Sequence, residues 1–70
     1  TMSQFESIKK RIIDVACSNS PSWVCFDYKD DFPEYDDSFV FDCVSALRSM
    51  SIKNIEIRNN ADSVFMVRCL

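Results

Sequence analysis

The sequence predicts a small α+β domain in which two helices and three strands follow one another in the order α-β-α-β-β. Two segments repeat their apolar residues at helical spacing, and three others are rich in β-branched and aromatic residues. The last of these strand-like segments is apolar on both sides, which is typical of a strand at the centre of a sheet. We therefore expect a three-stranded sheet in the order 1-3-2, with both helices on one face.

The first helix is predicted over residues 3–17. Ser3 and Glu6 form a capping box, with a serine N-cap and a glutamate three positions later, just ahead of apolar residues at helical spacing. Pro21 ends the segment because it has no N–H to continue a helix.

The first strand is predicted over residues 22–28, which are mostly β-branched or aromatic. Side chains alternate between the two faces of a strand. We expect Val24, Phe26 and Tyr28 to face the core, because the opposite set includes Asp27, which should stay in water.

The second helix is predicted to begin at Asp36, Asp37 or Ser38 and to end near residue 50. Acidic residues at its start and Arg48 near its end suit the helix dipole. Its apolar stripe at helical spacing predicts a buried face made of Val40, Cys43, Val44, Leu47 and Met50.

The last two strands, residues 52–58 and 63–70, are predicted to form a hairpin around a turn at residues 59–62. The expected register pairs Arg58 with Asp62, which puts Ile55 opposite Phe65. A shift by one residue would bring two cations opposite each other, and like-charge pairs destabilise a sheet.

The chain is expected to form one domain over residues 1–70, with Thr1 as an added residue ahead of a native start at Met2. Its formal net charge of −3 and pI near 4.6 differ from the basic balance typical of nucleic-acid-binding proteins.

The sequence has no glycine, which excludes glycine-rich phosphate-binding loops. No signal peptide or apolar run of membrane-spanning length is recognisable, so we expect a cytoplasmic location.

The four cysteines, Cys17, Cys25, Cys43 and Cys69, each lie within an apolar pattern. Two interpretations are open: reduced and mostly buried thiols, or a disulfide framework. The lack of an export signal favours reduced thiols. No C-x-x-C spacing and no histidine are present, so we expect neither a zinc site nor a cofactor.

An acidic segment rich in aromatic residues is the strongest functional candidate. Residues 26–42 hold seven of the eleven carboxylates and a single cation, Lys29. The candidate partner-binding residues are Asp27, Tyr28, Asp30, Asp31, Phe32, Glu34, Tyr35, Asp36 and Asp37. The alternative is that these acids only cap the second helix and maintain solubility. That alternative explains Asp30, Asp31 and Glu34 least well.

Enzymatic activity is not expected, because a chain without histidine lacks the usual base to activate serine or cysteine. Carboxylate pairs need a cleft to act as acid and base, and 70 residues can scarcely build one. We therefore predict a non-enzymatic protein-binding module, such as an inhibitor or adaptor, that engages a basic partner surface and can imitate the charge pattern of nucleic acid.

Two other functions stay open. A nucleic-acid-associated module would use Lys53, Arg58 and Arg68 on the sheet, with Trp23 as a stacking platform for bases. A homodimer would form through an open sheet face that includes Trp23, Val64 and Met66. No motif in the chain is specific enough to indicate a family.

Overall fold

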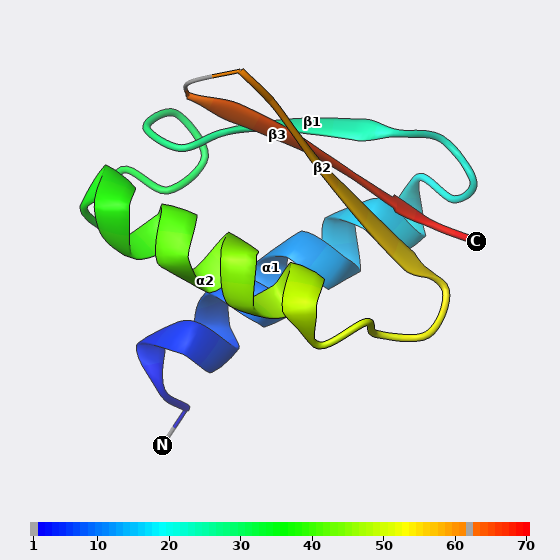
Figure 1. Cartoon of the computed structure of the whole chain (residues 1–70), viewed down its shortest axis with the longest axis horizontal. Helices are drawn as coiled ribbons and strands as arrows, with labels where there is room; N and C mark the ends of the chain where they lie inside the picture. Colours follow the sequence, from blue (N-terminus) through cyan, green and yellow to red (C-terminus); the bar gives the residue numbers. More distant parts are fainter. Residues whose placement is uncertain (1, 62) are drawn as a thin grey trace.

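A computed structural model describes residues 2–61 and 63–70 and confirms the predicted fold (Figure 1). The elements are α1 (Gln4–Ser18), β1 (Val24–Asp27), α2 (Asp37–Ser49), β2 (Ile55–Ala61) and β3 (Val64–Cys69). The sheet is antiparallel, in the predicted order β1-β3-β2. Both helices lie against one face of this sheet (Figure 1). Within the described residues, no helix is both long and apolar enough to cross a membrane.

Helix α1 begins as its sequence predicts. Ser3 has an extended backbone, and its hydroxyl accepts a hydrogen bond from the N–H of Glu6 at 3.1 Å. The helix then turns Ile8, Ile12 and Ala16 towards the sheet, where all three are fully buried. These residues are one helical turn apart, so a single stripe of α1 covers the core.

Helix α2 buries four of its five predicted core residues: Val40, Cys43, Val44 and Leu47. The prediction was wrong for Met50, which is 50% exposed. The helix ends at Ser49, and Ser51 just after it adopts a left-handed φ of 50°, so the chain leaves the helix axis there. A chain without glycine must place such conformations on other residues, and Asn54 also has a positive φ, of 69°.

The hairpin register differs from the predicted one. Arg58 lies opposite Met66, and Ile55 lies opposite Cys69 instead of Phe65. Strand β2 continues to Ala61 with an irregularity after Asn59, so the turn is shorter than expected. Asp62, the predicted partner of Arg58, lies outside the described residues. The shift from residue 65 to residue 69 is an even number of positions, so the side chains keep their predicted faces.

The core is organised around Phe65 on the central strand. Its ring centroid lies 5.1 Å from that of Phe26, 5.2 Å from that of Tyr28 and 6.3 Å from that of Phe32. None of these four side chains is more than 3% exposed. Phe32 belongs to the connection between β1 and α2, and its complete burial anchors that connection to the sheet.

We predict that Phe32→Ala destabilises the fold by about 3–5 kcal/mol, since it removes a fully buried ring and leaves a cavity. Phe41→Ala is the matched control, because that ring is 47% exposed; we expect it to cost about 1 kcal/mol or less. Urea unfolding followed by circular dichroism measures both. Equal midpoints for the two variants would show that Phe32 does not anchor the connection.

Candidate functional site

The connection between β1 and α2 opens with a turn built by two aspartates. The carboxylate of Asp27 accepts hydrogen bonds from the backbone N–H groups of Asp30, at 2.9 Å, and Lys29, at 2.8 Å. These bonds lower the pKa of Asp27. The carboxylate of Asp31 accepts a bond from the N–H of Asp27 at 2.7 Å. Asp27 and Asp31 are therefore engaged in shaping the loop itself.

Arg11 on α1 makes hydrogen bonds to the middle of the same loop. Its guanidinium donates two bonds to the carboxylate of Glu34, at 2.7 and 3.2 Å, and one to the carbonyl oxygen of Asp31 at 2.7 Å. It also lies 5.1 Å from the centroid of the Phe32 ring. The bonds from Arg11 lower the pKa of Glu34 from its usual 4.5 to about 2. Reciprocally, the hydrogen bond with Glu34 raises the pKa of Arg11.

Two of the predicted contact residues lie in the core. Tyr28 is 3% exposed and Phe32 is fully buried, so neither ring can touch a partner while the domain is folded. Burial also raises the pKa of Tyr28. For Tyr28 this burial confirms the core face that strand alternation predicted, and both rings pack against Phe65 on the central strand. The burial does not fit the expectation that Tyr28 and Phe32 contact a partner. Tyr35 alone among the three candidate aromatics is accessible, being half-buried.

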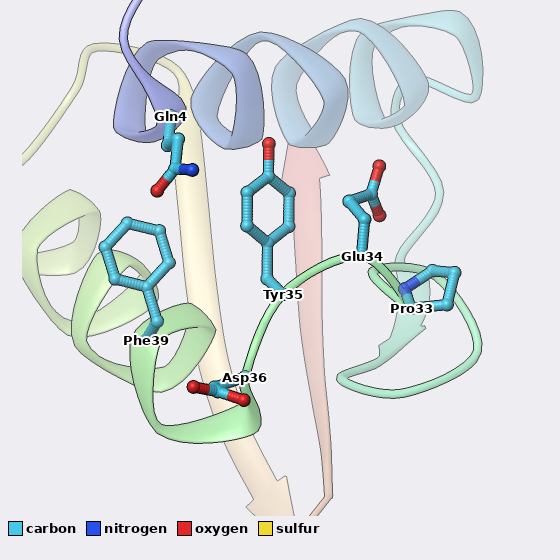
Figure 2. A pocket seen from close by; sticks show the side chains of 6 residues that line it. All are labelled: Gln4, Pro33, Glu34, Tyr35, Asp36 and Phe39. Carbon is cyan, nitrogen blue, oxygen red and sulfur yellow. The ribbon is translucent and has the colours of Figure 1, made fainter.

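Tyr35 forms part of an open hollow of about 410 Å³ between the loop and the two helices (Figure 2). Its lining residues are Gln4, Pro33, Glu34, Tyr35, Asp36 and Phe39. The rings of Tyr35 and Phe39 are 5.8 Å apart and tilted by 35°. In Figure 2 the Tyr35 hydroxyl and the Glu34 carboxylate both point towards α1, and Gln4 faces the ring of Phe39.

Sequence reasoning missed three residues of this hollow: Gln4, Pro33 and Phe39. Pro33 and Phe39 flank the predicted residues closely in the sequence, so the alternation of acidic and aromatic residues on both sides of Tyr35 could have drawn attention to them. Gln4 lies at the start of α1 and reaches the hollow only through the packing of the two helices. No local pattern could have identified it.

The remaining candidates, Asp30, Asp36 and Asp37, are exposed. None of the ion pairs formed between described residues involves them. Asp36 is the N-cap of α2, yet its side chain makes no capping hydrogen bond. These three carboxylates therefore keep their charge available to solvent, whereas that of Glu34 is matched by Arg11.

A second polar cluster lies on the sheet face that the helices leave open. The guanidinium groups of Arg58 and Arg68 each lie 4.7 Å from the centre of the Trp23 ring. Arg68 is also paired with Glu56. Lys53, expected on this surface, instead lies in the turn before β2, so the sheet is less basic than predicted. The Trp23 ring is already in contact with two cations, which reduces the area it offers to a nucleic-acid base.

All four cysteines are free thiols, as predicted. The expectation that they are mostly buried is wrong, because Cys17 and Cys25 are exposed, Cys69 is partly exposed and only Cys43 is buried. Cys25 lies on the open sheet face, since its neighbours Val24 and Phe26 take the core positions of β1.

Comparison of the chain with protein-family models, with curated proteins and with solved structures finds no match. Within the described part of the chain, no three cysteine, aspartate or glutamate side chains gather where they could hold a metal ion. The function of the chain is therefore inferred from the chemistry of the hollow and of the carboxylates beside it.

We predict that Glu34→Gln lowers the free energy of unfolding at pH 7 and that its effect disappears in acid. The folded state depresses the pKa of Glu34, so its stabilising contribution is present above the usual pKa of 4.5 and is lost as the pH falls towards 2. Urea unfolding of both proteins between pH 7 and pH 2 measures the difference. In an Arg11→Gln background the substitution should have little effect at any pH. A difference that is constant with pH would contradict the pairing.

Proposed function

We propose that the chain is a small non-enzymatic protein-binding module that engages a basic surface of its partner through residues 27–37. The hollow receives one lysine or arginine side chain from that partner. Such a module would act as an inhibitor of its partner or as an adaptor. The observation that carries the proposal is the combination, in one hollow, of two accessible aromatic rings with the unpaired carboxylate of Asp36.

The lining of the hollow suits a side chain with an apolar stem and a positive end. The tilted rings of Tyr35 and Phe39, together with Pro33, offer apolar surface to the methylene groups of lysine or arginine. The faces of these rings also attract a cation, and attraction of this kind contributes about 0.5–2 kcal/mol depending on desolvation. A purely apolar ligand would leave the carboxylate of Asp36 without a partner.

Charge around the hollow supports the same class of partner. Arg11 matches the charge of Glu34, so an incoming cation would be attracted chiefly by Asp36, with Asp30 and Asp37 elsewhere on the connection and at the start of α2. The formal net charge of −3 adds long-range attraction for a basic protein. These exposed charges favour fast association and salt-sensitive binding.

The rigidity of the loop also favours binding. The turn at Asp27, the clamp from Arg11 and the burial of Phe32 fix the loop at three points. A surface that is already ordered loses little conformational entropy when it binds. The carboxylates that make hydrogen bonds within the loop thus keep the exposed carboxylates in fixed positions.

We predict that Asp36→Lys weakens capture of partner proteins from an extract of the source cells by about tenfold or more, since it reverses the charge at the hollow. Glu6→Lys is the matched control, because it makes the same charge change at the start of the other helix and carries a similar penalty from the helix dipole. Quantitative mass spectrometry of the captured proteins compares the variants with the unaltered chain.

Capture is repeated after nuclease treatment, and an arginine-rich peptide is titrated into the isotope-labelled chain. We expect nuclease to have no effect, and peptide-induced NMR shifts centred on Tyr35, Asp36 and Phe39 that weaken at high salt. Equal capture by Asp36→Lys and the unaltered chain would refute the proposal. Capture lost after nuclease, or direct binding of single-stranded RNA, would favour the nucleic-acid alternative on the Trp23 face.

A further inference from the structure

The end of α1 and the end of β3 bring two cysteines together from opposite ends of the chain. Cys17 lies in the last turn of α1, and Cys69 is the last residue of β3. Figure 1 shows the end of α1 beside the carboxyl end of β3. The side chain of Cys69 is also close enough to that of Cys17 to raise the pKa of its thiol.

A single serine links the backbones of the two cysteines. The N–H of Ser20 donates to the carbonyl oxygen of Cys17 at 3.3 Å, and its hydroxyl donates to the carbonyl oxygen of Cys69 at 2.6 Å. The last turn of α1 is further fixed by Asn19, whose side chain donates to the carbonyl oxygen of Val15 at 2.8 Å. Because Ser20 bonds to both backbones, Cys17 and Cys69 are neighbours in the ordered fold.

The two thiols differ in their access to solvent. Cys17 is exposed, whereas Cys69 is partly buried and packs against the core on the inner face of β3. A small oxidant in solution therefore meets the sulfur of Cys17 first. Cys69 is the neighbouring thiol on the protein side.

We propose that Cys17 and Cys69 form a redox-active thiol pair that hydrogen peroxide converts into a disulfide joining α1 to β3. In the first step, peroxide transfers one oxygen atom to the Cys17 sulfur, giving a sulfenic acid and one molecule of water. In the second step, the Cys69 sulfur attacks the Cys17 sulfur, the S–O bond breaks, and a second water leaves. Two thiols are oxidised by two electrons, and one peroxide is reduced to two waters.

The nearby side chain of Cys69 raises the pKa of Cys17, as does partial desolvation of the Cys17 thiol, so little thiolate is present at neutral pH. Oxidation is therefore slow, and the pair suits a response to sustained peroxide. The disulfide would close a loop from residue 17 to residue 69, which is most of the chain. Closing so long a loop restricts the unfolded chain strongly and should raise Tm by roughly 10 °C or more.

The test treats the reduced chain with excess hydrogen peroxide and analyses the monomer by mass spectrometry. We expect a product lighter by two hydrogen atoms, in which proteolysis after Trp23 separates Cys17 from Cys25 and leaves Cys17 joined to Cys69. Dithiothreitol should reverse the change and the rise in Tm. Cys25→Ser should form the same product, whereas Cys17→Ser and Cys69→Ser should not.

A separate measurement tests whether Cys17 is oxidised before Cys69 attacks it. Cys69→Ser should accumulate a sulfenic acid on Cys17 that dimedone traps, and Cys17→Ser should give no adduct on Cys69. Any of three results would overturn the proposal: a disulfide that involves Cys25 or Cys43, oxidation that yields only disulfides between chains, or a Cys17 that advances to sulfinic acid while Cys69 stays reduced.

Discussion

The stacking of aromatic rings on Phe65 is the interaction on which the rest of the structure depends. Phe65 sits on the central strand, and it gathers Phe26 from one edge of the sheet and Phe32 from the following loop. The helices then close over this cluster with fully buried aliphatic residues such as Ile12 and Val44. A domain of 70 residues has only a small core, so the burial of these large rings contributes substantially to its stability.

The same packing creates the candidate site. Because Phe32 is buried in the core, the acidic residues next to it lie close to α1. There Arg11 pairs with Glu34 and donates a hydrogen bond to the backbone of Asp31. What remains outside is the hollow with Tyr35, Phe39 and Asp36. The accessible surface is thus smaller than the acidic segment as a whole, and it is held in place by the core beneath it.

Much of the fold could be predicted from the sequence, because periodicity determines which side of a helix or strand faces the core. The sheet order followed from β3, which is apolar on both faces. The hairpin register could not be predicted, because it was argued from the charges of Arg58 and Asp62, whereas β2 extends to Ala61 with an irregularity near the turn. Strand alternation placed Tyr28 in the core, but the composition of the acidic segment could not separate Phe32, which is buried, from Tyr35, which is accessible. Gln4 and Arg11 reach the site through tertiary packing that no local pattern reveals.

The acidic connection between β1 and α2 is an ordered part of the domain. Amide hydrogen exchange of the unaltered chain tests it most directly. Three backbone N–H groups of the connection donate to backbone carbonyl oxygens: Tyr28 to Ser63 at 2.9 Å, Asp31 to Asp27 at 3.1 Å and Tyr35 to Phe32 at 3.1 Å. The amide of Tyr28 should exchange as slowly as those of β3, and the amides of Asp31 and Tyr35 should be clearly protected. Exchange of all three at the rate of an unstructured peptide would show that the connection is not ordered.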